Sequence, residues 1–113
     1  MADRALRTVL DGMSYLEGPR WHAGRLYVSD FYTGDVVAVD LDGGADPETV
    51  VNVPAQPSGL GWMPDGSMLV VSMRDRRVLR VRDGGAPEVH ADLSELARTA
   101  EHLEQLVGQF SLA

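Results

Sequence analysis

The sequence predicts an all-β chain of two four-stranded antiparallel sheets, followed by a C-terminal amphipathic α-helix. The main observation is an internal repeat at a spacing of about forty residues, built from short apolar runs. In this repeat Trp21 aligns with Trp62 and Gly24 aligns with Gly66. The second observation is that glycine-containing turns separate the runs. Short strands repeated at this period are typical of the blades of a β-propeller, so we expect two blades.

The first expected blade alternates short strands with turn residues. Its turns are Ala23-Gly24, Thr33-Gly34 and Asp42-Gly43-Gly44, since glycine adopts the backbone angles that tight reversals need. Its strands are expected at Gly18–Trp21, Arg25–Ser29, Asp35–Asp40 and Glu48–Val53. Before this blade, we expect a further short strand at Arg7–Leu10.

The second expected blade repeats the same order of elements. Two hairpin turns, Pro64-Asp65-Gly66 and Asp83-Gly84-Gly85, separate its strands. The strands are expected at Gly59–Trp62, Met68–Ser72, Arg77–Arg82 and Glu88–Ala91. Because Trp21 and Trp62 hold the same place in the repeat, we expect both rings to pack between adjacent blades rather than to bind a ligand.

From Asp92 onward the apolar period changes to that of a helix. Asp92 and Glu95 form a start similar to a capping box, and Gly108 is a plausible end. The apolar residues that recur at three- and four-residue steps are Leu93, Leu96, Ala97, Ala100, Leu103 and Val107. We therefore divide the chain into an N-terminal strand segment (1–14), two blades (15–55 and 56–92) and a helix with a tail (93–113).

Composition excludes several classes of function. The chain has 113 residues and a formal net charge of −7, which disfavours binding to nucleic acid. It contains no cysteine, so neither a disulfide nor a thiolate metal site is available. We find no run of about 18 apolar residues that would span a membrane and no secretion signal, so we expect a cytoplasmic protein.

Several short motifs occur in a specific order between residues 15 and 93. They are Leu16-Glu17-Gly18-Pro19-Arg20-Trp21, Leu26-Tyr27-Val28-Ser29-Asp30, Gln56-Pro57-Ser58-Gly59-Leu60-Gly61-Trp62 and Leu69-Val70-Val71-Ser72-Met73. In this order and spacing, the chain resembles the N-terminal third of the gluconolactonase/senescence-marker/luciferin-regenerating enzyme-like family of six-bladed β-propellers.

The resemblance implies a divalent metal site and a hydrolytic activity. In that family a cation, often Ca²⁺ or Zn²⁺, binds in the central channel, and the glutamate of the Glu-Gly-Pro motif is its first ligand. That position is Glu17 here. A metal placed there would polarise the carbonyl of a lactone or sugar-like ester and activate water, so no side-chain nucleophile is needed.

The resemblance ends near Leu93, before the blades that supply the other ligands. Ca²⁺ binds about six to eight oxygen atoms, and one carboxylate does not hold it. We therefore expect a lactonase-like, metal-dependent hydrolase that is incomplete, with weak or no activity by itself. Three copies of the chain would supply six blades and bring three Glu17 side chains to one axis. The alternative is a non-catalytic module that binds partners or forms homo-oligomers.

The remaining chemistry-bearing residues suggest few other sites. Arg74 follows a predicted strand, and we expect it to face the channel and bind an anionic or polyhydroxy ligand. The other arginines between residues 76 and 82 are expected on a solvated face, paired with acids. His22, His90 and His102 are interpreted as surface residues. No serine lies in a Gly-x-Ser-x-Gly elbow, which argues against a hydrolytic triad.

Two blades leave two sheet faces without a neighbouring blade. Several hundred square ångströms of uncovered apolar surface forfeit on the order of 10 kcal/mol, comparable to the stability of a small domain. We expect the C-terminal helix to cover the second blade, and we expect the chain to associate with itself.

Overall fold

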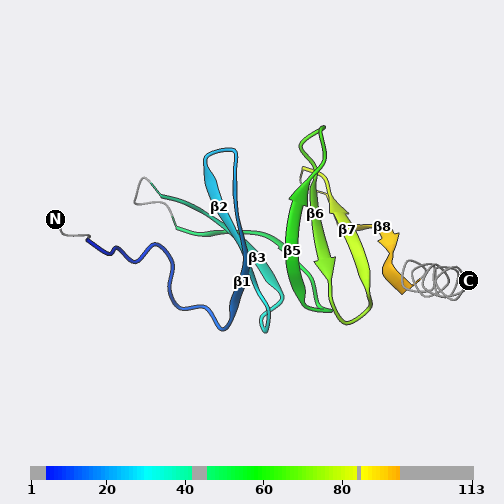
Figure 1. Ribbon diagram of the computed structural model, residues 1–113, viewed down its shortest axis with the longest axis horizontal. Coiled ribbons are helices and arrows are strands. Elements are labelled where there is room, and N and C mark those ends of the chain that lie inside the picture. Colours follow the sequence, from blue (N-terminus) through cyan, green and yellow to red (C-terminus); the bar gives the residue numbers. More distant parts are fainter. Residues whose placement is uncertain (1–4, 42–45, 84, 95–113) are drawn as a thin grey trace, which may run out of the picture.

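The computed structural model describes residues 5–41, 46–83 and 85–94, which form two four-stranded antiparallel β-sheets. The first sheet contains β1 (Leu16–His22), β2 (Arg25–Asp30), β3 (Asp35–Asp40) and β4 (Glu48–Asn52). The second contains β5 (Pro57–Trp62), β6 (Met68–Ser72), β7 (Arg77–Val81) and β8 (Glu88–Asp92). In each sheet the strand order follows the chain, as Figure 1 shows. The prediction of two antiparallel four-stranded sheets is confirmed for these residues.

Two predicted features lie outside the described residues. The C-terminal helix is expected over 93–113, of which only Leu93 and Ser94 are described. The turn at Asp42-Gly43-Gly44 also falls outside them.

The register shows that the two sheets repeat one another. In the first sheet Trp21 lies opposite Leu26, which in turn lies opposite Val39. In the second sheet the corresponding row is Trp62, Met68 and Val81. Trp21 and Trp62 therefore hold equivalent positions, which is how the sequence aligns them.

Irregularities in the ladders repeat as well. The pairing of β1 with β2 shifts between Glu17 and Arg20, and that of β5 with β6 shifts between Pro57 and Leu60. The outer strand pairs shift at matching positions too, between Val36 and Val37 and between Val78 and Leu79. A β-bulge is a specific local feature, so its recurrence in both sheets supports the internal repeat independently of the tryptophans.

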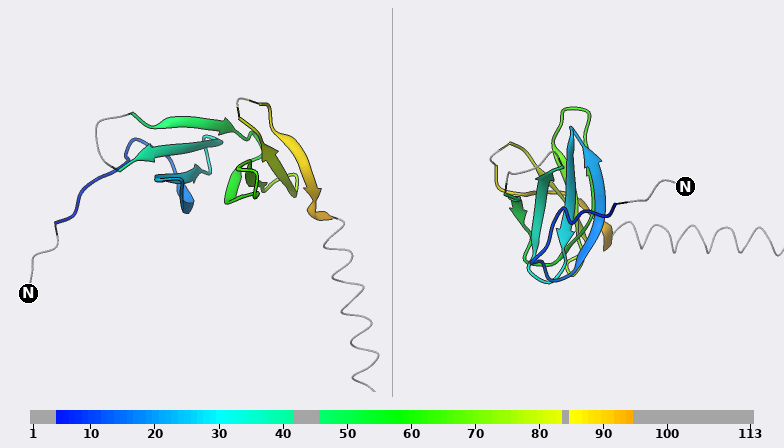
Figure 2. Two further views of the ribbon diagram at one scale, coloured as in Figure 1. Left: turned by 90° about the horizontal axis from the view of Figure 1, so that it is seen from above. Right: turned by 90° about the vertical axis from the view of Figure 1, so that its left-hand side faces the viewer.

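The hydrophobic core lies between the two sheets. Val36 and Val70, one from each sheet, are fully buried. The other core residues are Val51 and Val53 from the end of the first sheet, and Leu60, Met68 and Val81 from the second. Along the chain, β5 packs against β1 and β2. The molecule is thus held together by a face-to-face contact between the sheets, seen from above in Figure 2.

The segment before β1 forms no strand, so the prediction of a strand at Arg7–Leu10 is wrong. An isolated strand has no partner for its backbone N–H and C=O groups, and each described strand pairs only with its neighbours in sequence. The segment lies instead on the side of the first sheet away from the second sheet (Figure 2). The Arg7 side chain donates a hydrogen bond to the Leu41 carbonyl there.

Candidate functional site

Glu17, the predicted metal ligand, lies on β1 close to the second sheet. It is half-buried and pairs with Ser29 of β2. The residue after it, Gly18, has a φ of 63°. A Cβ atom at Gly18 would lie 2.7 Å from the Ser58 carbonyl oxygen of β5. Glycine is therefore required here both by the left-handed backbone and by the close approach of the two strands.

A hydrogen bond from β2 also holds the start of β5 against the first sheet. The Ser29 hydroxyl, which is completely buried, donates to the Ser58 carbonyl oxygen over 2.8 Å. Gly18 and Ser29 thus both contact the beginning of β5, and Glu17 is their neighbour in the first sheet. The sequence motif around Glu17 has a clear structural role in this position, because it joins the two sheets.

Arg74, the predicted ligand-binding residue, lies in the exposed turn between β6 and β7. Its backbone N–H donates to the Ala55 carbonyl oxygen over 2.9 Å. The turn is at the end of the second sheet where β5 begins, and Glu17 is near the corresponding end of the first sheet. No hydrogen bond or ion pair joins the two side chains within the part of the chain that the structure describes.

The described residues do not fit a metal centre. Across 5–41, 46–83 and 85–94, no three His, Cys, Asp or Glu side chains gather closely enough to hold a metal ion. Glu17 alone supplies at most two oxygen atoms, which is too few for Ca²⁺ or for a tetrahedral Zn²⁺ site. We therefore assign no chemical step to a metal in these residues.

Aromatic contacts connect the sheets at the other end of β1. The Trp62 ring stacks on the His22 ring, with centroids 4.0 Å apart and an angle of 11° between the planes. The Tyr27 ring meets Trp62 edge-on at 4.9 Å. The expectation that Trp62 packs between sheets is confirmed. His22 ends β1 as expected, but it is a packing residue rather than a free surface residue.

Trp21 has a different environment from its equivalent. Its side chain is 60% exposed, so the prediction that both tryptophans pack between sheets is wrong for Trp21 within the described residues. The reason is that Trp21 points away from the second sheet, and no described sheet lies on that side. An exposed tryptophan of this kind is frequent in interaction surfaces.

An open cavity of about 360 Å³ lies between the sheets near the start of β2 and the end of β5. Its volume is at the lower end of the range of about 300–1,000 Å³ that is usual for ligand pockets. Five apolar or aromatic residues from both sheets line its wall: Tyr27, Val50, Trp62, Met68 and Val81. Charged residues of both signs also line it: Arg25, Glu48, Arg82 and Asp83. Sequence analysis missed this cavity because it forms between segments far apart in the chain.

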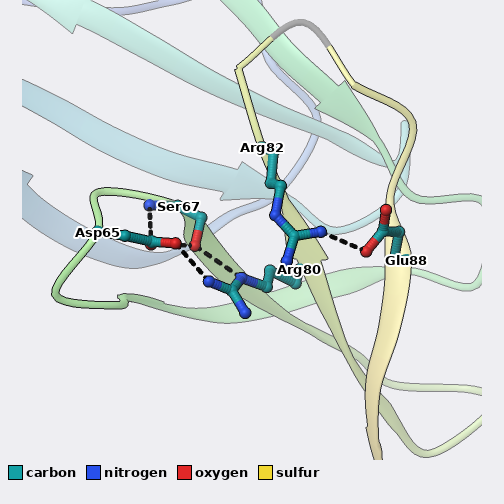
Figure 3. A network of polar contacts seen from close by, with 5 residues as sticks. All are labelled: Asp65, Ser67, Arg80, Arg82 and Glu88. Atoms are coloured by element: carbon teal, nitrogen blue, oxygen red, sulfur yellow. Dashed lines mark hydrogen bonds and ion pairs between the residues drawn. The ribbon is translucent and has the colours of Figure 1, made fainter.

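A polar network covers the second sheet near this cavity (Figure 3). Asp65 accepts hydrogen bonds from the backbone N–H and hydroxyl of Ser67 and from Arg80. The contacts from Ser67, and then the charge of Arg80, hold the pKa of Asp65 at about 2, below its ordinary value of 3.8. Arg82 pairs with Glu88 over 2.6 Å. The expectation that these arginines pair with acids is confirmed, and Arg82 is exposed as expected, whereas the Arg80 side chain is only 19% exposed.

Asp30 is a buried carboxylate that sequence analysis did not single out. Its two carboxylate oxygens accept hydrogen bonds from the backbone N–H groups of Ser14 and Tyr15, each over 2.9 Å. Burial raises the pKa of Asp30, but these bonds and those from Thr33 outweigh it, so the pKa lies below its ordinary value. The charged carboxylate therefore anchors the N-terminal segment to β2. This structural role is enough to account for the burial of Asp30, without a role in binding or catalysis.

Two further residues with polar or titratable side chains, His90 and Ser72, lie on strands of the second sheet. His90 is exposed on the outermost strand β8, as expected, and His102 lies outside the described residues. Ser72 ends β6, as expected, and its buried hydroxyl has no hydrogen-bond partner among the described residues. Among residues 5–41, 46–83 and 85–94, there is no helix with the length and hydropathy needed to cross a membrane.

We compared the chain with known protein families, with curated proteins and with solved structures, and none of the three comparisons gives a match.

Proposed function

We propose that this chain is a pair of propeller-type blades that acts as an interaction module, in which the free sheet faces pack against further β-sheets. The observation that carries this proposal is the contrast between the two equivalent tryptophans. Trp62 packs against His22 and Tyr27 of the neighbouring sheet, whereas Trp21 holds the same register position and is 60% exposed. A repeated contact residue without its contact indicates a missing neighbour.

Metal-dependent hydrolysis of a lactone or sugar-like ester is the second candidate. It is favoured by the position of Glu17, which is half-buried near the start of β1, next to the close approach of Gly18 to Ser58 of β5. Binding of Ca²⁺ or Zn²⁺ there requires oxygen or nitrogen ligands from other sheets, because the described residues supply one carboxylate. We therefore propose weak or no turnover for this chain by itself.

A lactonase assay tests whether the described carboxylate is enough for hydrolysis. The wild-type chain and Glu17→Ala are incubated with a δ-lactone and with Ca²⁺ or Zn²⁺, and acid release is followed by pH-stat titration. We expect both proteins to give the rate of the metal-containing buffer, because one carboxylate does not form a metal centre. A matched control is Ser58→Ala, the residue after Pro57 and thus the equivalent of Glu17 on β5.

The opposite result would overturn the proposal. Metal-dependent turnover in the wild-type chain and in Ser58→Ala, with loss in Glu17→Ala, would identify the chain as a hydrolase. Circular dichroism of each variant shows whether it keeps the β-sheet structure, so that a loss of rate is not mistaken for unfolding.

A further inference from the structure

Among the described residues, two surfaces on opposite sides of the molecule leave apolar side chains exposed or half-buried. The front face is the side of β1 that carries Pro19 and Trp21, both exposed. The back face is the side of the second sheet that points away from the first sheet. Its apolar residues are Leu69, Val71 and Val78, all half-buried. The N-terminal segment lies on the same side as the front face, where Val28, Val37 and Val39 of β2 and β3 are only 3–4% exposed, so the front face is limited to β1, where Trp21 is 60% exposed.

The existing contact between the sheets shows what the back face could accept. In that contact, Trp62 sits on a seat formed by His22 and Tyr27. Near the other end of β1, the Ser58 carbonyl oxygen lies over the bare backbone of Gly18. An indole ring on an apolar seat and a carbonyl oxygen over a glycine are thus the two features of the contact.

The second sheet repeats both features on its free side. Tyr27 lies opposite Ala38, and Leu69 lies opposite Arg80 at the equivalent place, so Leu69 takes the position of Tyr27. The residue after Trp62 is Met63, which takes the position of His22 and is half-buried. Met63 and Leu69 therefore form an apolar seat of the same kind, with no described ring on it.

The glycine is repeated too. Gly59 follows Ser58 as Gly18 follows Glu17, and it is exposed. A Cβ atom at Gly59 would meet only Val71 of its own sheet, at 3.5 Å. The place that Ser58 covers in the first sheet is thus open in the second.

We infer that the back face binds the front face of a second copy of this chain, an inference that rests on the interaction function proposed above. Trp21 of the second copy occupies the seat of Met63 and Leu69, and its β1 backbone lies over Gly59. The repeat supports this choice of partner, because β1 and β5 carry the same contact residues at the same register. One hydrogen bond is not reproduced, since Val71 stands in the place of Ser29.

This contact joins two different faces, so each added copy presents a new free face. Such a heterologous contact continues beyond a dimer, into a closed ring or an open chain. The net charge of −7 on each copy opposes association, and salt screens that repulsion over about 8 Å at 0.15 M. We therefore expect assembly to strengthen as the salt concentration rises.

Sedimentation velocity on the full chain tests the inference. The wild-type chain is expected to show concentration-dependent species heavier than twice its 12.3 kDa mass. Trp21→Arg places a charge in the contact on the front face, and Leu69→Arg does the same on the back face. Each variant alone is therefore expected to be monomeric. Loss of a central tryptophan contact weakens association by about 30-fold or more.

Mixing the two variants gives the decisive result. Trp21→Arg keeps its back face and Leu69→Arg keeps its front face, so an equimolar mixture is expected to form a one-to-one dimer and nothing heavier. If Leu69→Arg does not fold, Met63→Arg tests the other half of the seat from outside the strands. A monomeric wild-type chain at all concentrations, or a mixture without the dimer, overturns self-assembly. Metal-dependent turnover in the lactonase assay would overturn the interaction function itself, whichever assembly state the chain has.

Discussion

Gly18→Ala is expected to lower the free energy of unfolding by about 2–4 kcal/mol, because it acts on the backbone and on the contact between the sheets at once. Gly18 has a φ of 63°, which L-residues adopt only with strain. The added methyl group would also lie 2.7 Å from the Ser58 carbonyl oxygen, a backbone atom that cannot rotate away. The strands β1 and β5 would have to separate. Urea denaturation followed by circular dichroism measures the change.

Gly24→Ala is the matched control for Gly18→Ala. Gly24 also has a left-handed φ, of 78°, but no atom lies within 4 Å of the place that its added methyl group would take, so only backbone strain is added. We expect a loss of about 1–2 kcal/mol for this variant. Equal losses in the two variants would show that the close approach of β5 to Gly18 contributes nothing to stability.

Leu60→Ala is expected to lower the free energy of unfolding by about 2–5 kcal/mol, the usual range for truncation of a buried leucine. Leu60 is 7% exposed and belongs to the core between the sheets. Its removal leaves a cavity next to residues of both sheets, in the core that joins them. A small domain is stable by only about 5–15 kcal/mol, so the variant is expected to melt at a much lower temperature. Differential scanning calorimetry measures the shift.

Leu6→Ala provides the comparison for the leucine truncation. Leu6 is 99% exposed, and its loss is expected to change the free energy of unfolding by less than about 0.5 kcal/mol. If Leu60→Ala were as harmless as Leu6→Ala, the contact between the sheets would not be the main source of stability.

The repeat and the strands could be predicted from the sequence because they depend on local patterns. Turn glycines such as Gly24 and Gly66 mark the hairpins, and both have the positive φ that these turns need. The strand β7 shows the same logic, since Leu79 and Val81 contact the core while Arg80 points to the opposite side. Alternation along one strand is enough to assign these faces.

The environment of each tryptophan could not be predicted from the repeat. Aligned positions share a register, but their surroundings depend on which sheet lies next to them. Trp62 faces the first sheet, whereas Trp21 faces away from the second sheet. The role of His22 was missed for the same reason, because its partner Trp62 belongs to the other sheet.

The candidate site was the least predictable part. Glu17 is selected by a resemblance to a family, and that resemblance carries no information about ligands beyond this chain. The described residues bring no other metal-ligating cluster to Glu17. The Glu17-Gly18 motif instead has a structural explanation, because Gly18 has no side chain and so allows β5 to pack against β1. The cavity between the sheets has no sequence signal, since its lining comes from five different strands and their turns.

The central claim is that the second sheet packs face to face on the first at equivalent registers, with Trp62 on the seat of His22 and Tyr27. Nuclear Overhauser cross-peaks between the Trp62 indole and the rings of His22 and Tyr27 test it most directly. We predict strong cross-peaks to both rings, given centroid distances of 4.0 and 4.9 Å. A spectrum in which the Trp62 indole contacts only residues of its own sheet would contradict the account.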